Sequence, residues 1–504
     1  MLTSGKSHNP PESRILQVIV CAVLIAAAFC VSCDCSTCWL FPTRPMRDSS
    51  VFRYIGLLMK NGGIPYRDTF DHKGPILYFI NYLGILFGVN GVWLFELLFL
   101  SATSILTYKV IRRFCSSCVS AAGAVIVMFQ LHGVLAGGNR VQEYALPFIV
   151  CSLLIFVKYL QMEEVSKLEL AICGACFMVV LLLRVDFVTL WVAMCPVVLI
   201  RELRKKNNRL GYFLRWFLLG AAFVLIPVLL YLCFNGAIHE FWRQYIQFNV
   251  RYTGAEPDSH TVDQVSAIFL SGSFLIPAAI LCVSALIDKK NRVISLSTLC
   301  YTVLTAAVTA LPGRSFSYYC IILLPAMVVP AALLIAIVEK IIQSRTLLWI
   351  CILLAVAVAV FPWTPILTEG PDAAPFYRTS EYAISNWIRE NTEATDTIIT
   401  CGNYDLLYVL SDRKAASRYS YQMPIAMVDP DIYGEFIEDL EKNQPAVLVW
   451  SSNDLQGKFD LRTLKKCVGK FVQDNHYTFV NTCGQYTVYA AARISHTVSD
   501  LKGG

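Results

Sequence analysis

About eleven apolar segments, each close to the length needed to cross a bilayer, recur along this chain of 504 residues. Only 15% of the residues are charged and 56% are hydrophobic, whereas an ordinary soluble domain is about 25% charged. The mean hydropathy is correspondingly high, at +0.55. These features predict a polytopic α-helical membrane protein whose spans lie near residues 15–32, 91–111, 118–135, 143–160, 169–183, 187–200, 212–234, 265–287, 293–311, 318–338 and 346–362.

The basic residues alternate with these segments and therefore predict an orientation. If the N-terminus is cytoplasmic, every loop assigned to the inner side carries lysine or arginine, as the positive-inside rule requires. An odd number of spans then places the C-terminal region outside the cell membrane. The net charge of +6 requires no nucleic-acid partner if it lies in these inner loops. Their basic residues are Arg112, Arg113, Lys158, Lys167, Arg201, Arg204, Lys205, Lys206, Arg209, Lys289, Lys290, Arg292, Lys340 and Arg345.

The composition changes near residue 372 to that of a water-soluble domain. Apolar residues there follow helical spacing in two segments and form short buried runs typical of strands in others. We expect a membrane domain at residues 1–371 and a small extracytoplasmic α/β domain at residues 372–504. The latter has no glycine-rich phosphate loop, so an accessory role is favoured over a second enzyme. Its predicted elements are helices at 380–391 and 432–442, strands at 396–401 and 446–450, and a hairpin at 471–480 and 485–491.

Charged side chains crowd into residues 48–81, directly after the first apolar segment. Charge is costly near a bilayer, so such a cluster indicates a functional site. The apolar spacing predicts a short amphipathic helix on the membrane face, capped by Asp48 or Ser49 and ended by Asn61. Pro75 is suited to the first turn of a second apolar helix.

This stretch resembles the first extracytoplasmic loop of the C-type (GT-C) glycosyltransferases, in the branch that contains the protein O-mannosyltransferases and the lipid A aminoarabinose transferases. Asp48 takes the place of an acidic residue that follows the first transmembrane helix. The run Phe-Asp-His-Lys-Gly-Pro at residues 70–75 and the aromatic, Asn-containing start of the next helix at 78–81 match the rest of the pattern. Many relatives have two adjacent acids where this chain has Asp48-Ser49, so no metal ligand is assigned and a divalent cation stays open.

The resemblance implies an integral-membrane, inverting glycosyltransferase. It would move a sugar from a polyprenyl-phosphate donor to an acceptor outside the cytoplasm, which could be a cell-envelope glycan, lipid or protein. Asp48 would then be the general base that takes the proton of the acceptor hydroxyl. The alternative for Asp48 is an ordinary helix cap.

Charged and hydrogen-bonding side chains on the same outer face are candidates for holding the donor phosphate or the substrate. Each has a structural alternative: Lys73 could extend to the interface, Arg184 could pair with Asp186, and Arg140 with Glu143 could be a salt-bridged loop end. Tyr318 and Tyr319 stand where some relatives carry His-Tyr. The full candidate set is Asp71, His72, Lys73, Arg140, Glu143, Arg184, Arg314, Tyr318 and Tyr319.

Two other functions are compatible with many helices and a few buried charges. One is a transporter or flippase for a lipid-linked glycan, although the sequence shows no internal repeat and no paired broken helices. The other is a non-catalytic envelope assembly protein. Most of the 19 cysteines lie in apolar segments and are interpreted as packing residues. For Cys33, Cys35 and Cys38, a loop disulfide is slightly favoured over a metal site, because no fourth metal ligand is evident.

Overall fold

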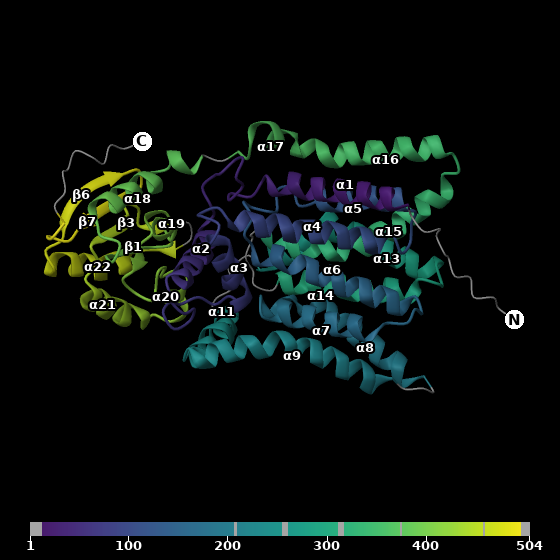
Figure 1. Cartoon of the computed structure of the whole chain (residues 1–504), viewed down its shortest axis with the longest axis horizontal. Coiled ribbons are helices and arrows are strands. Elements are labelled where there is room, and N and C mark those ends of the chain that lie inside the picture. Colours follow the sequence, from purple (N-terminus) through teal and green to yellow (C-terminus); the bar gives the residue numbers. More distant parts are fainter. Residues whose placement is uncertain are drawn as a thin grey trace.

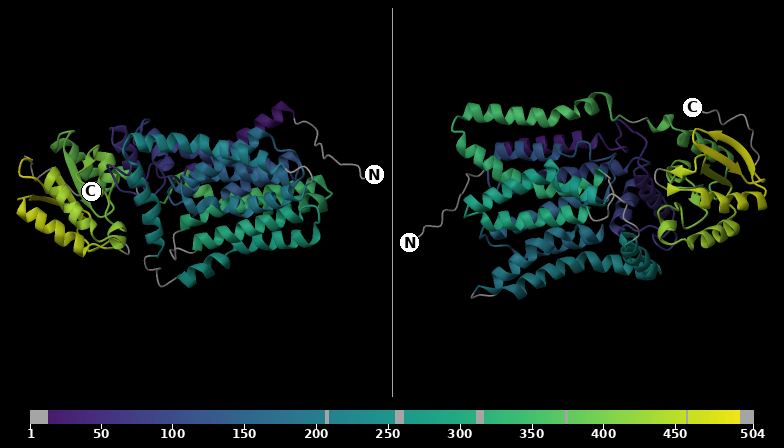
Figure 2. Two further views of the ribbon diagram at one scale, coloured as in Figure 1. Left: turned by 90° about the horizontal axis from the view of Figure 1, so that it is seen from below. Right: turned by 180° about the vertical axis from the view of Figure 1, so that it is seen from behind.

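The computed structural model describes residues 13–205, 209–254, 261–310, 317–372, 375–456 and 459–494. A bundle of long, roughly parallel helices occupies one end of an elongated molecule, and a mixed α/β unit occupies the other (Figure 1). The short helices α2 (Arg47–Lys60) and α3 (Pro75–Ile85) lie between the two parts. The described chain begins in the helical bundle, with α1 (Arg14–Ser32), and ends in the α/β unit, with residues just after β7 (Tyr486–Ala490) (Figure 2).

Helices occupy all the predicted membrane segments. Within the described residues, seven are both long and apolar enough to cross a membrane: Arg14–Ser32, Val92–Ile111, Val141–Leu160, Leu210–Phe234, Arg292–Ala310, Ser317–Ile341 and Arg345–Glu369. The prediction of a polytopic helical membrane protein is confirmed, whereas the number eleven is not fixed, because the remaining helices are shorter. These are α5 (Ser117–Phe129), α7 (Lys167–Leu181), α8 (Thr189–Leu203), and the pair α12 (Thr261–Phe269) and α13 (Gly272–Ile287), which interrupts the predicted span at 265–287.

The seven long spans correspond to numbered elements in Figure 1. They are α1 (Arg14–Ser32), α4 (Val92–Ile111), α6 (Val141–Leu160), α9 (Leu210–Phe234), α14 (Arg292–Ala310), η3 (Ser317–Leu323) continuing into α15 (Leu324–Ile341), and α16 (Arg345–Val360) continuing towards α17 (Thr364–Glu369). Small residues let one of these elements, α9, approach the shorter helix α7 closely. A side chain at Gly174 in α7 would overlap the carbonyl oxygen of Phe217, and one at Gly220 in α9 would overlap that of Ala171. Close backbone approach at small residues is a common basis of helix packing in membranes.

The predicted amphipathic helix is present, but its surroundings differ from the prediction. α2 begins after Met46, so Asp48 lies in the first turn and not at the cap, while Asn61 is the C-cap and Pro75 opens α3 as predicted. Instead of lying on a membrane face with one side free, α2 is buried along almost its whole length. The reason is that the α/β unit covers its other side, where the amide of Ala415 donates to the Tyr54 hydroxyl at 2.9 Å.

The α/β unit contains a five-stranded sheet of order β2-β1-β3-β7-β6. The central strands β1 (Thr397–Cys401) and β3 (Val447–Ser451) are parallel, and β7 (Tyr486–Ala490) runs antiparallel to β3 and β6 (Thr478–Cys483). The edge strand β2 (Lys414–Ala415) is short and parallel to β1. Flanking helices are α18 (Ser380–Asn391), α19 (Leu406–Ser411), α21 (Ile432–Asn443) and α22 (Arg462–Asp474).

Most of the predicted elements of this unit are confirmed, but the first arm of the terminal hairpin is wrong. Residues up to Asp474 continue α22, and the strand begins only at Thr478. Leu464, Val468, Phe471 and Val472 are buried on one face of that helix. Their spacing of three and four residues is helical, so a prediction based only on the apolar end of this run mistook the helix for a strand.

Candidate functional site

Asp48 lies where α2, the start of α6 and the entry to α15 meet. Its Oδ2 accepts hydrogen bonds from Arg140 Nη1 and from the Tyr318 hydroxyl, both at 3.1 Å. Both of these described contacts use the same oxygen, and the side chain is 47% exposed. Asp48 is therefore held in one orientation while part of its carboxylate faces open space.

Arg140 is positioned by an unusual loop. Ala136, Gly137, Gly138 and Asn139 all have positive φ, which winds the chain tightly before α6 begins. The side chain is only 2% exposed, and its guanidinium carbon lies 4.1 Å from the centre of the Tyr318 ring. It also donates from Nη2 to the carbonyl of Ala136 at 3.2 Å. Arg140 is thus a buried cation that joins Asp48 to Tyr318.

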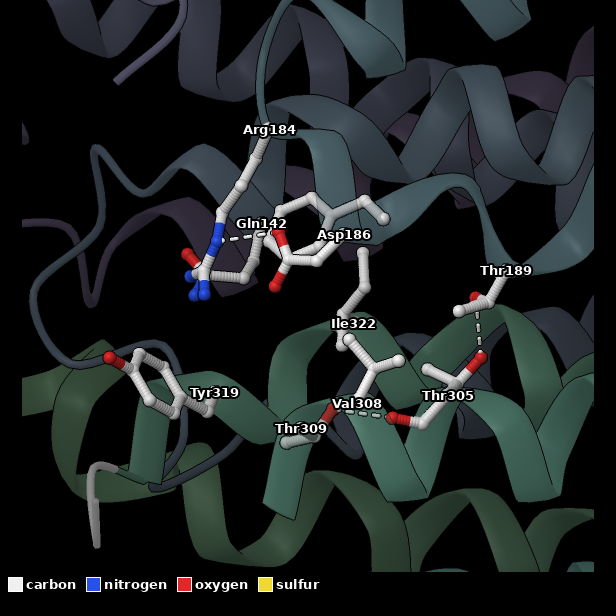
Figure 3. Close-up of a pocket in the computed structure, with 10 residues that line it drawn as sticks. Gln142, Arg184, Asp186, Thr189, Thr305, Val308, Thr309, Tyr319 and Ile322 are labelled. Carbon is white, nitrogen blue, oxygen red and sulfur yellow. Dashed lines mark hydrogen bonds and ion pairs between the residues drawn. The ribbon is translucent and has the colours of Figure 1, made fainter. Parts of the chain in front are cut away.

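A second part of the site is a small hollow beside Arg184 (Figure 3). The Nε of Arg184 pairs with Asp186 at 2.8 Å, so the structural alternative considered for this residue is realised. Its guanidinium end extends toward Tyr319, with 5.4 Å between the guanidinium carbon and the ring centre. The hollow is lined by Gln142, Arg184, Asp186, Phe187, Thr189, Thr305, Val308, Thr309, Tyr319 and Ile322.

The two parts are linked through the adjacent residues Tyr318 and Tyr319. The rings of Tyr318 and Tyr319 are 5.0 Å apart in an edge-to-face arrangement, with Asp48 on the side of Tyr318 and Arg184 on the side of Tyr319. Burial alone would lower the pKa of Arg184, but Asp186 and the two tyrosines raise it above its usual value. The guanidinium therefore remains charged at any physiological pH.

The run Phe70-Asp71-His72-Lys73-Gly74 forms a neighbouring group. Lys73 Nζ lies 2.5 Å from His72 Nε2, and the amide of Gly74 donates to the carbonyl of Leu183 at 3.2 Å. Because Leu183 directly precedes Arg184, this backbone contact joins the loop that carries Lys73 to the segment that carries Arg184. A side chain at Gly74 would overlap the carbonyl oxygen of Leu182, so only glycine permits this approach.

Asp71 differs from its neighbours because it is fully engaged within the protein. It is buried and accepts hydrogen bonds from the hydroxyls of Tyr78 at 2.8 Å and Tyr421 at 2.6 Å. Tyr421 belongs to the α/β unit, and the amide of Phe70 donates to the carbonyl of Arg418 in the same unit. In this arrangement Asp71 anchors the α/β unit on the loop between α2 and α3.

Glu143, the remaining described candidate, does not join this group. Glu143 is completely buried on the far side of Arg140, beside Glu96 and Cys35. Arg314 lies outside the described residues. Sequence reasoning missed Glu96, Tyr421 and Gln142. Glu96 alone had a usable signal, because a carboxylate within an apolar span is costly unless it has a role.

A divalent cation at Asp48 does not fit the described surroundings. The carboxylate faces the guanidinium of Arg140 and the phenol of Tyr318. Both groups donate hydrogen bonds to it, and while protonated neither can coordinate a cation. Within the described residues, Asp48 is also absent from any group of three histidine, cysteine or acidic side chains close enough to share an ion. We derive no catalytic step through a metal at this position.

Solved structures resemble the chain along nearly its whole length. ArnT from Cupriavidus metallidurans bound to undecaprenyl phosphate is 14% identical with a TM-score of 0.62, covering 96% of this chain and 100% of that one. The apo state of ArnT gives 13% identity, a TM-score of 0.63 and coverage of 94% and 97%. A third similar structure is AglB, the oligosaccharyltransferase of Archaeoglobus fulgidus in complex with an inhibitory peptide and a dolichol-phosphate. It is 13% identical with a TM-score of 0.51, and the match covers 95% of this chain and 75% of that one.

These similarities define the class of the protein: it is a membrane protein with the fold of the GT-C glycosyltransferases, to which ArnT and AglB belong. A family model matches residues 12–347, most of the chain. The protein therefore belongs to the family described as "Putative competence-induced protein Ccs4 N-terminal domain". No curated protein matches it.

Proposed function

We propose that this protein is an inverting membrane glycosyltransferase that uses a polyprenyl-phosphate-linked sugar, with Asp48 as its general base. The observation that carries the proposal is the carboxylate of Asp48, oriented by Arg140 and Tyr318 yet half exposed, next to a hollow that contains Arg184. The GT-C fold supports it, since ArnT is described with undecaprenyl phosphate bound and AglB with a dolichol-phosphate.

The reaction requires one proton acceptor. As the acceptor hydroxyl attacks the anomeric carbon, its proton passes to Asp48, and the bond between that carbon and the phosphate oxygen breaks with its electron pair on the phosphate. Oδ1 is the oxygen of Asp48 suited to take the proton, because Oδ2 holds both described hydrogen bonds. Arg140 and Tyr318 fix the orientation of the Asp48 carboxylate, and therefore the direction from which the acceptor hydroxyl must approach it.

The departing phosphate needs stabilisation of its negative charge. Arg184 and Lys73 are the described cations best placed for it, because the contact between Gly74 and Leu183 holds their segments together. A guanidinium can bind phosphate oxygens in pairs, whereas an ammonium acts as a point charge. His72 lies beside Lys73 and is assigned to the same phosphate group. Arg314 is also assigned to it, because in the sequence it lies shortly before Tyr318 and Tyr319.

The proposal includes the arrangement of the protein in the cell membrane. The N-terminus would be cytoplasmic, and residues 372–504 would form an extracytoplasmic accessory domain behind the membrane domain of residues 1–371. The acceptor would be an envelope glycan, lipid or protein that reaches Asp48 from the outer side. In support, the α/β unit contacts the same outer loop that carries Asp48 and Lys73.

A substrate panel tests this function directly. The purified full-length protein would be incubated in detergent with polyprenyl-phosphate sugars that differ only in the sugar, and lipid phosphate release would be measured with candidate acceptors. We expect one donor to be consumed in an acceptor-dependent way. Consumption of none of them, combined with movement of the same lipids across the bilayer of proteoliposomes, would indicate a flippase instead.

A further inference from the structure

A compact group of three potential metal ligands lies behind Arg140. Cys35 follows α1, Glu96 lies within α4, and Glu143 is in the first turn of α6. The sulfur of Cys35 and one oxygen from each carboxylate all lie within 4.8 Å of one another, and all three residues are buried. No other such group occurs among the described residues.

The group has an unused ligand atom. Glu143 Oε1 is buried and has no hydrogen-bond partner among the described residues. Glu96, in contrast, accepts from the Thr37 hydroxyl and from the amide of Asn139, which holds its carboxylate against Cys35. An ionised carboxylate in a buried space needs a compensating charge, and a bound cation would supply one.

The surrounding backbone makes room for the group. Gly138 has a φ of +70°, and a side chain there would collide with Glu96 Oε1 and lie 2.6 Å from the sulfur of Cys35. The loop after α1 is fastened to the same segment, since Ser36 donates from its amide to the carbonyl of Gly137 at 2.8 Å. Three segments distant in sequence therefore converge on one point.

We propose that Cys35, Glu96 and Glu143 bind a zinc ion that fixes the loop carrying Arg140. Zinc accepts thiolate and carboxylate ligands at about 2.0–2.3 Å, so ligand atoms around it would be roughly 3.3–3.8 Å apart. The three groups need to move inward by only about an ångström from their present spacing. The fourth position is left for water or for the second oxygen of a carboxylate.

The ligand chemistry selects this metal. A thiolate disfavours Mg²⁺ and Ca²⁺, which prefer oxygen ligands, and suits Zn²⁺. On binding, the Cys35 thiol and any protonated carboxyl of Glu96 or Glu143 release their protons to solvent, so that one thiolate and two carboxylates face the ion. The remaining negative charge is opposed by the buried guanidinium of Arg53, which interacts electrostatically with Glu96.

The proposed zinc site would affect catalysis only by fixing the position of Arg140. Glu143 is three residues from Arg140, and both belong to one capping box in which the amide of Arg140 donates to Glu143 Oε2 at 3.5 Å. Fixing Glu143 to α4 and to the loop after α1 therefore fixes the cation that orients Asp48. The inference concerns metal binding and is independent of the reaction the protein performs.

Metal content of the full-length protein tests the proposal. Protein purified in detergent without chelators, from cells supplied with zinc, should contain about one zinc ion per chain by elemental mass spectrometry. Cys35→Ser and Glu143→Gln should each lower this to a small fraction. Two matched controls should retain the metal: Glu202→Gln, another fully buried acid in α8, and Cys401→Ser, another buried cysteine in β1.

A spectroscopic measurement on the unmodified protein covers the case in which a variant does not fold. After exchange of zinc for Co²⁺, a thiolate ligand produces a sulfur-to-cobalt charge-transfer band in the near ultraviolet. We expect this band in the wild-type protein and in Cys401→Ser. Its absence from the wild type, or zinc retained by both Cys35→Ser and Glu143→Gln, would overturn the assignment.

Discussion

Two roles are open to Lys73: extension to the membrane interface or contact with the donor phosphate. An ammonium at the end of a membrane loop often extends to the interface without any specific partner. Here it lies 2.5 Å from His72 Nε2 and one residue from the backbone contact with Leu183, which favours a role at the donor phosphate.

Lys73→Ala should therefore weaken the use of donor more than the use of acceptor. Loss of a charge-assisted contact with phosphate costs about 1.5–3 kcal/mol, or roughly ten- to a hundredfold in apparent donor affinity. The measurement is the transfer rate as a function of each substrate, with Lys60→Ala, at the end of α2, as the matched control. An unchanged dependence on donor would show that Lys73 only extends to the interface.

Asp405 provides a test of the α/β unit that involves no substrate. Burial raises the pKa of its carboxyl from 3.8 to about 7, while the Ser420 hydroxyl donates to it. Between about pH 4 and pH 7 the unfolded chain loses this proton and the folded chain keeps it, so the free energy of unfolding falls as pH rises. Above about pH 7 the carboxyl of Asp405 is ionised in both the folded and the unfolded chain. Its contribution to the free energy of unfolding then no longer changes with pH.

Asp405→Asn should remove this pH dependence. The wild-type protein should lose up to about 4 kcal/mol of stability from this one group across that range, whereas the amide does not titrate. Thermal unfolding in detergent at several pH values, followed through the α/β unit, measures the difference between the two slopes. Equal slopes for wild type and Asp405→Asn would mean that Asp405 is ionised in the folded state.

At the scale of elements, the approach of α3 to the end of α7 depends on a single glycine. A methyl group at Gly74 would overlap the carbonyl oxygen of Leu182 and push Lys73 away from Arg184. Gly74→Ala should cost about 1–3 kcal/mol, typical of overpacking, and should weaken donor use as well. Gly434→Ala in α21 is the control, because a side chain there meets open space. Equal thermal stability of the two variants would contradict the close contact.

The sequence predicted the helices and their ends, but not the contacts between elements that are far apart in the chain. Hydropathy located the membrane helices, and turn residues placed Asn61 and Pro75 correctly, because these signals are local. The hydrogen bond from Tyr421 to Asp71 joins residues 350 positions apart, and no local pattern encodes it. Burial of α2 beneath the α/β unit was missed for the same reason.

The candidate site was predictable to a similar degree. Topology correctly suggested that Asp48, Arg140 and Tyr318 share one face, but not that the last two donate to the same oxygen of the first. Glu96 was missed because a single carboxylate hardly changes the hydropathy of a 20-residue helix. The sequence also could not distinguish Asp71, which is buried, from its partly exposed neighbour Lys73.

At the scale of the whole molecule, the α/β unit and the membrane domain are joined at Asp71. Tyr421→Phe removes one of the two tyrosine hydroxyls on this buried carboxylate, at a cost of about 1–3 kcal/mol. We expect faster hydrogen–deuterium exchange in the loop at residues 66–74, where the amide of Phe70 donates to Arg418. Tyr477→Phe is the matched control, since its hydroxyl donates at 2.6 Å to Pro445 within the unit. Faster exchange of that loop in Tyr477→Phe alone would contradict this docking contact.

The central claim is that Asp48 accepts the proton of the acceptor hydroxyl. Asp48→Asn keeps the shape of the side chain and an oxygen for Arg140 and Tyr318, but an amide cannot act as a base near neutral pH. If Asp48 served only to interact with the dipole of α2, the change would cost below about 1 kcal/mol of stability, with activity near normal. Asp48→Glu should keep part of the activity, and Asp68→Asn, in the loop between α2 and α3, should keep nearly all of it.

The decisive measurement is therefore the transfer rate of Asp48→Asn in detergent at saturating donor, with the melting temperature recorded for each variant. The account predicts a loss on the order of a hundredfold to ten-thousandfold in rate, with the melting temperature nearly unchanged. A rate within a factor of a few of wild type would contradict the assignment of Asp48 as the base.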